Sequence, residues 1–281
     1  MNHVQLTAKE RVCCVLKYIF LALCVFIALF PIVWVIMSSL KSNAEILSNG
    51  VALPKNPSLI GYKNALSISP ILSYFGHSVI ITVISTALNV LLLAMAAYVF
   101  ARCRFRGRDV LYFILSLSMV IPMTALLHPV YKVVQSLGLY DTKVGLILVY
   151  TALNLPMSLL ILRGTFLSIP KALEEAAYVD GAGFVRTFFQ IMMPCAKGGL
   201  TSAAVLAFLQ SWNEFTFALV LTSGQNARTL PLSLSYFTAQ FSFDYTAMFA
   251  AVTIAVIPSI VVFAIFQEQV VSSLTAGSVK E

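Results

Sequence analysis

Six stretches of this sequence run for close to twenty residues or more with almost no charge, which is about the ~20 residues that a bilayer-spanning helix needs. They cover residues 18–40, part of 64–101, 110–131, 144–162, 198–221 and 245–267. Only the fifth stretch contains a charged side chain, Glu214. In the second stretch, turn-forming residues at 67–70 and at Gly76 predict a helix from about Ser78 to Phe100. The pattern therefore predicts an all-α membrane protein with six transmembrane helices.

The overall composition agrees with this prediction, because 59% of the 281 residues are hydrophobic and only 10% are charged. Soluble domains carry about 25% charged residues. The composition thus excludes a soluble enzyme, a disordered chain and a nucleic-acid-binding domain. The first apolar stretch has 23 residues, more than the roughly 7–15 of a signal-peptide core. We therefore expect that stretch to be a spanning helix and not a cleaved signal.

The distribution of basic residues predicts the orientation in the membrane. The two ends and the connections on their side carry 12 Lys and Arg, whereas the opposite connections carry 6. The side richer in Lys and Arg is expected to be cytoplasmic, so both termini are predicted to lie in the cytoplasm. Cys13, Cys14, Cys103 and Cys195 then fall on the reducing side, where disulfides are rare. The spacing of the cysteines fits no metal site that we recognise.

The connection between the fourth and fifth stretches, residues 168–194, is too long to be a simple link. Ser168 is a candidate N-cap with Pro170 in the first turn, and residues 171–180 are rich in helix formers. Gly181 is expected to end this helix. A second short helix is predicted from 183 to 192, ended by Pro194, with Asp180 as its possible cap. The sequence therefore predicts two short helices joined at a glycine.

The first of these short helices has a face that a partner could approach closely. Leu173, Ala176, Ala177 and Asp180 follow the i, i+3, i+4, i+7 spacing and so share one side. Because the alanine side chains are small, a partner could approach the helix backbone closely on that side. Glu174 and Glu175 lie early in the helix, where its dipole favours negative charge.

These residues resemble the "EAA" loop of binding-protein-dependent ABC importer permeases of the carbohydrate-uptake type. The matching residues are Glu175-Ala176-Ala177, Asp180-Gly181-Ala182, Phe188, Ile191 and Pro194. Trp212-Asn213-Glu214-Phe215 resembles the W-N-E-F run of the same permeases, and the tail 274–280 resembles their usual C-terminus. The likeness is to the six-span, maltose-type subunit. These permeases often have Asn-Ser where this chain has His77-Ser78.

The resemblance implies a type I ABC importer permease fold. It implies an N-terminal segment, first helix and external loop at 1–70, a permease core at 71–267 and a cytoplasmic tail at 268–281. It also implies a bacterial cell-membrane complex with a second permease subunit, two ATP-binding subunits and an external solute-binding protein that delivers a sugar. Contact with an ATP-binding subunit would fall on Leu173, Glu174, Glu175, Ala176, Ala177, Asp180, Gly181 and Ala182.

The chain itself is not expected to be an enzyme. It contains no GxxxxGK[ST] phosphate-binding loop, so ATP and Mg²⁺ would be bound by the partner ATPase subunits. We expect no cofactor, no metal and no nucleic acid in this chain.

Polar residues inside the apolar stretches are candidates for the translocation path. Gln210, Asn213 and Glu214 follow i, i+3, i+4 spacing, and a charge inside a membrane must face protein or water. They could line the path or form a hydrogen-bond network between subunits, and the sequence does not separate the two. For Asn154, hydrogen bonding between helices is favoured over a path role. Trp212 lies on another face and is interpreted as an interfacial anchor.

Three other functions compete with a sugar importer. The same machine could carry a polyol or a glycerophosphate solute. A stand-alone secondary transporter would more often have repeated halves and several intramembrane acids, whereas this chain has no evident repeat and only Glu214. An intramembrane enzyme would need clustered catalytic side chains, but the three histidines lie far apart at positions 3, 77 and 128.

Overall fold

A computed structural model describes residues 8–237 and 244–276, and these residues contain helices and connections but no strand. The tail motif at 274–280 lies partly outside them. The chain divides into two compact units, which are described separately: residues 1–69 with 234–254, and residues 70–233 with 255–281. Helix α14 (Tyr245–Ala276) contributes to both units, and so does a 3-10 helix, η4 (Leu230–Phe237).

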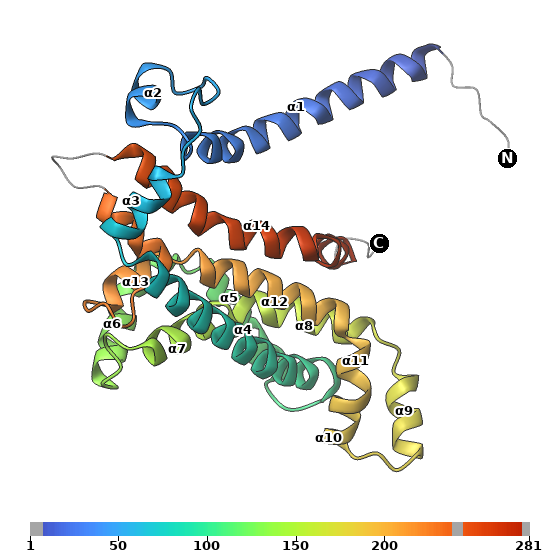
Figure 1. Ribbon diagram of the computed structural model, residues 1–281. Helices are drawn as coiled ribbons and strands as arrows, with labels where there is room; N and C mark the ends of the chain where they lie inside the picture. The colour runs from blue at the N-terminus through green and yellow to red at the C-terminus, as the bar shows by residue number, and fades with distance from the viewer. Residues whose placement is uncertain (1–7, 238–243, 277–281) are drawn as a thin grey trace. The chain divides into compact units, whose positions relative to one another are not determined.

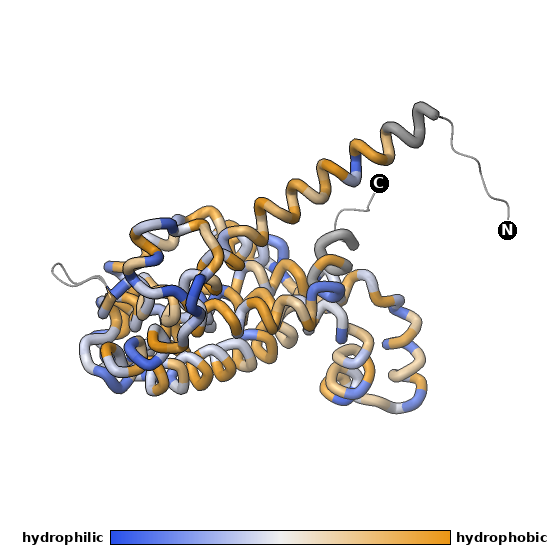
Figure 2. Tube along the Cα trace, turned by 45° about the horizontal axis from the view of Figure 1, so that its top comes forward, coloured by the Kyte–Doolittle hydropathy of each residue, from blue (hydrophilic) through white to orange (hydrophobic). Residues whose placement is uncertain are grey.

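The first unit contains α1 (Ala8–Ser38), α2 (Asn43–Ser48), α3 (Ile60–Ile68) and the start of α14 (Figure 1). Helix α1 is apolar along most of its length (Figure 2). Hydrogen bonds fix the connection after α1 to α14: the Thr246 hydroxyl donates to the carbonyl of Lys41 at 3.0 Å, and Asn64 donates to Asp244 at 2.9 Å. Gly61 allows α3 to approach Thr246, since a Cβ at Gly61 would lie 2.5 Å from the Thr246 methyl.

Helix α2 begins with a capping box, which explains why so short a helix forms. The Ser42 hydroxyl accepts from the Glu45 N–H, and the Glu45 carboxylate accepts from the Ser42 N–H at 3.0 Å. The Lys55 N–H also donates to Glu45 at 3.1 Å. These backbone donors, Ser42 first, lower the pKa of the Glu45 carboxyl below its ordinary value.

The second unit is built around the long helix α4 (Ile71–Arg102), which packs against α7, α8 and α12. The other elements are α5 (Arg108–Leu117), η1 (Ser118–Val120), η2 (Met123–Leu126), α6 (Leu127–Ser136), α7 (Lys143–Leu153), α8 (Leu155–Ser168), α9 (Ala172–Val179), α10 (Phe184–Thr187), η3 (Phe188–Met192), α11 (Met193–Cys195), α12 (Lys197–Trp212) and α13 (Thr216–Leu221). Two clusters of buried apolar side chains form its core, one at each end of α4.

Three helices, α1, α4 and α14, are each long and apolar enough to cross a membrane. The other candidates are bent pairs: α5–η1 with η2–α6 at 103°, α7 with α8 at 49°, and α10–α11 with α12 at 78°. Counting each pair as one span gives up to six spans in the described residues.

The predicted start of the second span was wrong. The second span begins at Ile71 and not near Ser78, because Pro70 supplies the start and Gly76 is tolerated inside the helix. The third apolar stretch is not one straight helix, since it breaks between Val120 and Met123 at Pro122. Helix α14, in contrast, is continuous through Pro258.

Candidate functional site

The connection 168–194 forms a helix–turn–helix, as predicted, made of α9 followed by α10 and η3. Figure 1 shows α9 and α10 beside each other, beyond the ends of α4 and α8. The segment Phe188–Met192 is a π-helical turn, which runs into α11. We refer to residues 172–192 as the helix–turn–helix.

The turn between the two helices is fixed by backbone hydrogen bonds around Gly181. The Ala182 N–H donates to the Ala177 carbonyl at 2.9 Å, and the Gly181 N–H donates to the Tyr178 carbonyl at 3.0 Å. This pair of bonds is a Schellman motif, in which the residue after the C-cap adopts a left-handed conformation. Gly181 has φ +78°, so the predicted role of this glycine in ending the helix is confirmed.

The predicted ends of the two helices were wrong in three details. Ser168 is the last residue of α8, and its hydroxyl donates to the Thr165 carbonyl, so it is not an N-cap of α9. Gly183, not Asp180, precedes the second helix. Pro194 does not end that helix but lies in the first turn of α11, where a missing N–H is tolerated.

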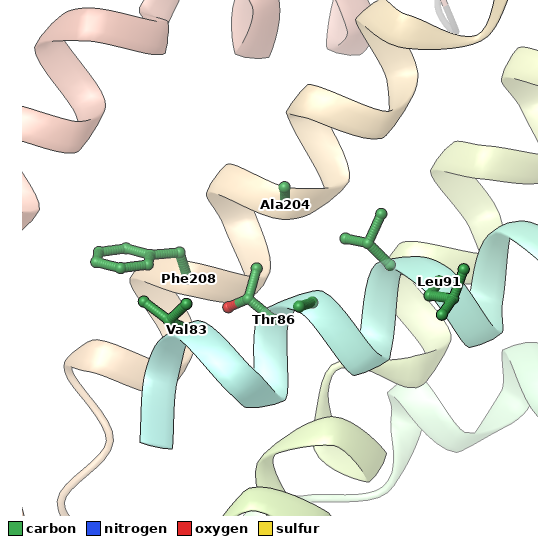
Figure 3. Close-up of a pocket in the computed structure, with 7 residues that line it drawn as sticks. Val83, Thr86, Leu91, Ala204 and Phe208 are labelled. Carbon is green, nitrogen blue, oxygen red and sulfur yellow. The ribbon is translucent and has the colours of Figure 1, made fainter. Parts of the chain in front are cut away.

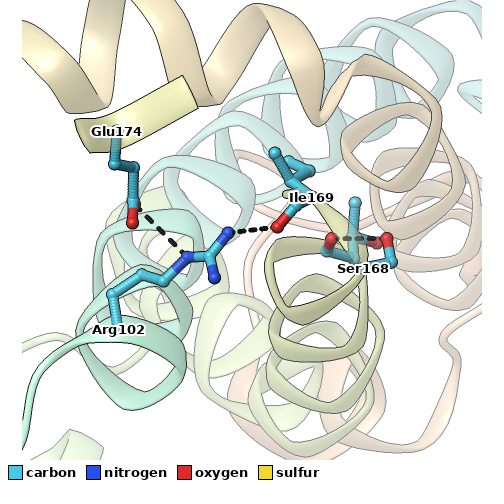
Figure 4. A network of polar contacts seen from close by, with 5 residues as sticks. Arg102, Ser168, Ile169 and Glu174 are labelled. Atoms are coloured by element: carbon cyan, nitrogen blue, oxygen red, sulfur yellow. Dashed lines mark hydrogen bonds and ion pairs between the residues drawn. The ribbon is translucent and has the colours of Figure 1, made fainter. Parts of the chain in front are cut away.

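The two adjacent glutamates of α9 have opposite environments. Glu174 points into the protein and is buried, whereas Glu175 is exposed. Glu174 Oε1 lies 3.3 Å from Nε of Arg102, the last residue of α4. The same guanidinium donates from Nη2 to the carbonyl of Ile169, at the end of α8 (Figure 4). Sequence reasoning missed Arg102, because nothing local in the sequence pairs it with Glu174.

The face predicted for α9 is only partly correct. Leu173, Ala176 and Asp180 are exposed, but Ala177 is buried with Glu174. The α-helical spacing allows both results, since Ala177 lies between the two sides of the helix. The exposed surface of the helix–turn–helix is also more apolar than expected, because it includes Leu173, Tyr178, Val179, Phe184, Val185 and Phe189. Val179 is the most exposed of them, at 88%.

Aromatic rings attach the second half of the helix–turn–helix to the rest of the unit. Tyr98 of α4 lies between Phe166 of α8, Phe184 of α10 and Phe188 of η3, with ring centroids 5.1–5.5 Å apart. Tyr98 and Phe188 are both buried. Phe188 therefore packs inside the unit, whereas Phe184 contacts the same tyrosine ring and stays partly exposed.

Glu214 is the charged residue among the apolar stretches, and hydrogen bonds within the chain stabilise its carboxylate. Helix α12 ends at Trp212, and Glu214 lies just before α13. Its carboxylate accepts from the N–H groups of Phe217 (2.6 Å) and Ala218 (3.0 Å) and from the hydroxyl of Tyr150 (2.8 Å). It therefore caps a helix start, where a negative charge is favoured.

The predicted stripe of Gln210, Asn213 and Glu214 is interrupted because α12 ends within it. Asn213 is exposed, donates to the Leu209 carbonyl at 2.8 Å and accepts from Ser259 at 3.3 Å. Gln210 is half-buried, with its amide nitrogen 3.9 Å from the sulfur of Met123.

Asn154 is buried at the break between α7 and α8, and its amide donates to the hydroxyl of Ser211 in α12 at 3.1 Å. The favoured interpretation, hydrogen bonding between helices, is thus confirmed. A second buried amide, Asn89 of α4, was missed; it donates to the Thr151 carbonyl and accepts from Ser158. An asparagine in a long apolar stretch was the signal for it.

Trp212 is not an interfacial anchor, contrary to the prediction. It is buried, its Nε1 donates to the Ala255 carbonyl at 2.9 Å, and its ring stacks on Phe208 with centroids 5.8 Å apart. Phe75 packs edge-on against the same ring. The indole hydrogen bond is satisfied inside the protein, which removes the reason for placing it at a membrane surface.

An apolar groove of about 390 Å³ lies between α4 and α12 (Figure 3). It is lined by Val83, Thr86, Ala87, Val90, Leu91, Ala204 and Phe208. Thr86 supplies the polar atom drawn there. Nothing in the lining could hold a metal, and the described residues contain no group of three or more His, Cys, Asp or Glu arranged as metal ligands.

A further polar cluster that the sequence did not reveal surrounds Asp141, between α6 and α7. Its carboxylate accepts from the N–H groups of Ser223 and Gly224, each at 3.0 Å, and its own N–H donates to the Leu221 carbonyl at 2.9 Å. Asp141 has φ +58°, a conformation that aspartate adopts more readily than most residues. The connection before α7 is thereby attached to the connection after α13. We call this attachment the Asp141 clamp.

Comparison with known proteins places the chain in a family. Residues 91–275 match the family described as binding-protein-dependent transport system inner membrane component. The chain is 36% identical to the diacetylchitobiose uptake system permease protein NgcG of Streptomyces coelicolor (96% of this chain, 90% of the relative). It is 34% identical to the sulfoquinovosyl glycerol transport system permease protein SmoH of Agrobacterium fabrum (94% and 93%), and 36% identical to the trehalose/maltose transport system permease protein MalG of Thermococcus litoralis (90% and 92%).

Its fold is also similar to that of a solved protein. A chain in the crystal structure of a bacterial ABC transporter involved in alginate import superposes with a TM-score of 0.81 at 23% identity, covering 94% of this chain and 98% of that one. The length and apolarity of the helices agree with a multi-pass cell-membrane protein. Permeases of this kind are transporters and not enzymes, and in general they act with a second permease, ATPase subunits and a binding protein. This chain belongs to the family of binding-protein-dependent inner-membrane permeases of ABC importers.

Proposed function

We propose that this chain is one of two permease subunits of an ATP-driven importer for sugars or oligosaccharides. The relatives are named for diacetylchitobiose, sulfoquinovosyl glycerol, and trehalose or maltose, and all of these names denote carbohydrates or their derivatives. A second permease subunit completes the translocation path, and an external binding protein delivers the solute. Both termini and the helix–turn–helix face the cytoplasm, which the excess of Lys and Arg on that side supports.

The helix–turn–helix is the site at which an ATP-binding subunit docks. The observation that carries this proposal is its exposed apolar surface, where Val179, Val185 and Tyr178 are 49–88% exposed. Exposed apolar clusters of this kind mark protein–protein contacts. The exposed carboxylates of Glu175 and Asp180 border the surface and favour a partner with basic groups there.

The nucleotide chemistry takes place in the partner. This chain has no phosphate-binding loop, so ATP and Mg²⁺ are bound by the two ATPase subunits. When the ATPase subunits close, the docked helix–turn–helix transmits their movement to the membrane-spanning helices. The path then changes from facing inward to facing outward.

The contacts within the chain separate the four candidate path residues into two kinds. Asn154 and Glu214 use their polar atoms to hold α7, α12 and α13 together. Gln210 and Asn213 retain exposed area and are the better candidates for lining the path. A polyol or glycerophosphate solute and a stand-alone transporter are less well supported than a sugar importer, because the relatives and their named solutes point away from both.

The test is to isolate the tagged chain in mild detergent from its native membrane, identify the proteins that accompany it, and reconstitute the complex in liposomes. We expect two ATPase subunits and a second permease to co-purify. With the binding protein added outside, ATP inside should drive uptake of labelled trehalose, maltose or diacetylchitobiose.

A matched pair of variants tests the docking site. Val179→Asp should abolish co-purification of the ATPase subunits while insertion into the membrane persists. Arg104→Ala, which changes an exposed side chain outside the helix–turn–helix, should not. Uptake by the isolated chain without ATP, or normal co-purification of Val179→Asp, would overturn the proposal.

A further inference from the structure

Arg102 attaches the helix–turn–helix to α4, a helix that is its neighbour in space but not in sequence. The Arg102 guanidinium contacts both the Glu174 carboxylate of α9 and the Ile169 carbonyl at the end of α8. The side chains of Arg102 and Glu174 are only 6% and 11% exposed. Figure 4 shows Arg102 reaching from the end of α4 towards both partners.

Burial makes this ion pair persistent. Removing one member of a buried pair leaves the other charge uncompensated, which is costly. The pair is therefore expected to stay intact while the protein moves, so that α9 and the end of α4 move together. It also leaves Glu174 unavailable to a partner protein, whereas the neighbouring Glu175 remains exposed.

A second contact on the same side of α4 holds the other half of the helix–turn–helix. Tyr98 lies one helical turn before Arg102, on the same face of α4. The centroid of its ring lies 5.2 Å from the ring centroid of Phe184 and 5.1 Å from that of Phe188. The last turn of α4 thus contacts α9 through a charge and α10–η3 through aromatic rings.

The direct links along the chain are weaker candidates for transmitting a movement. Between α8 and α9 the backbone leaves the helical conformation at Ile169, and α11 meets α12 at Ala196 with a 78° bend. Helix α4, by contrast, is continuous for 32 residues and packs against α7, α8 and α12.

We infer that Arg102 is a positioning residue, which transmits the displacement of the helix–turn–helix to α4 through its ion pair with Glu174. This inference rests on the proposed docking of an ATPase subunit at the helix–turn–helix. It assigns α4 as the first helix to move when the ATPase subunits close. It also gives the two adjacent glutamates separate roles: Glu174 binds within the chain, and Glu175 is available at the surface.

The experiment follows α4 directly in the purified complex. A single cysteine replaces Leu91, which lines the groove between α4 and α12, in a background without the five native cysteines. Its reaction rate with N-ethylmaleimide is measured without nucleotide and after trapping with ATP and vanadate. We expect the rate to change on trapping in the otherwise native chain.

Arg102→Met should lose this ATP-dependent change while the ATPase subunits still co-purify. Arg102→Lys should keep part of the change. Lys retains the positive charge, but it lacks the planar guanidinium that contacts both the Glu174 carboxylate and the Ile169 carbonyl. The charge exchange Arg102→Glu with Glu174→Arg should restore part of the change, because the ion pair re-forms while the hydrogen bond to the Ile169 carbonyl stays lost. Arg104→Met, an exposed arginine two residues away, is the matched control and should leave the change intact.

The outcomes separate this inference from the proposed function. If the ATPase subunits never accompany the native chain, the proposed docking fails. If they do, but trapping leaves Leu91→Cys unaffected, or if Arg102→Met responds as the native chain does, the role of Arg102 is overturned. If Arg102→Met does not assemble, the charge exchange decides: recovery supports the ion pair, and no recovery overturns it.

Discussion

At the scale of single residues, Gly181 sets the angle between the two short helices, because its φ of +78° closes the Schellman motif. Gly181→Val should cost about 1–2 kcal/mol in that conformation and loosen the turn. We expect lower ATP-driven uptake and faster proteolysis within 172–192. Limited proteolysis of the complex provides the measurement.

Gly183→Ala is the matched control for Gly181→Val. Gly183 has φ −75° and ψ 167°, which any residue adopts, and a Cβ there would meet nothing within 4 Å. It should therefore leave uptake and proteolysis unchanged. Equal behaviour of the two variants would contradict the role of the left-handed conformation.

Glu214 allows a second prediction at this scale. Glu214→Ala removes the acceptor for Tyr150 and for the first N–H groups of α13, and each buried group left unpaired costs about 1–3 kcal/mol. We expect a lower melting temperature of the detergent-solubilised complex. Asn213→Ala, at an exposed neighbour, should have a smaller effect; the reverse order would show that the cap is unimportant.

Residue roles could be predicted from the sequence where they depend on neighbours along the chain. The ending of α9 at Gly181 is such a case, because helix formers followed by glycine carry the signal locally. The burial of Glu174 is not, since its partner Arg102 lies 72 residues earlier in the sequence. Asp141 and its acceptor role towards Ser223 and Gly224 were missed for the same reason.

At the scale of elements, the apolar stretches predicted where spans occur, but a proline inside a stretch did not decide whether the helix breaks there. Pro122 lies at a 103° break, whereas α14 continues through Pro258. Both prolines lack an N–H and weaken a helix. Neighbouring helices and side chains can satisfy the backbone groups that a proline frees, so the surroundings of a proline influence whether a helix breaks there. That information is absent from a single stretch of sequence.

The contact between α8 and α12 gives a prediction at this scale. A Cβ at Gly199 would lie 2.0 Å from the Thr165 hydroxyl oxygen, so Gly199→Ala must push the helices apart. Overpacking of this kind costs about 1–3 kcal/mol. We expect a lower melting temperature, part of which Thr165→Ala should restore by removing the nearest atom.

Gly198→Ala is the control, because a Cβ at this adjacent glycine would meet nothing within 4 Å. It should be neutral or slightly stabilising, since alanine is the better helix former. A loss of stability as large as that of Gly199→Ala would mean that the close contact between α8 and α12 is not the cause.

At the scale of the whole molecule, the proposed orientation predicts from which side of the membrane each loop can be reached. In a cysteine-free background, a cysteine at Arg104, which is exposed after α4 and lies outside the proposed docking surface, should react with a membrane-impermeant maleimide only in inside-out vesicles. A cysteine at Leu53, which is 73% exposed in the loop after α1, should react in intact cells. The opposite pattern would invert the topology and remove the ATPase docking site from the cytoplasm.

The Asp141 clamp limits how the second unit can deform. One carboxylate holds the N–H groups of two successive residues that lie 82 and 83 positions further along the chain, so the two connections behave as one rigid rim. Separating them would break these hydrogen bonds to one carboxylate together. We therefore expect any widening of the proposed path to occur where the helices are interrupted, at Pro122, Asn154 and Ala196.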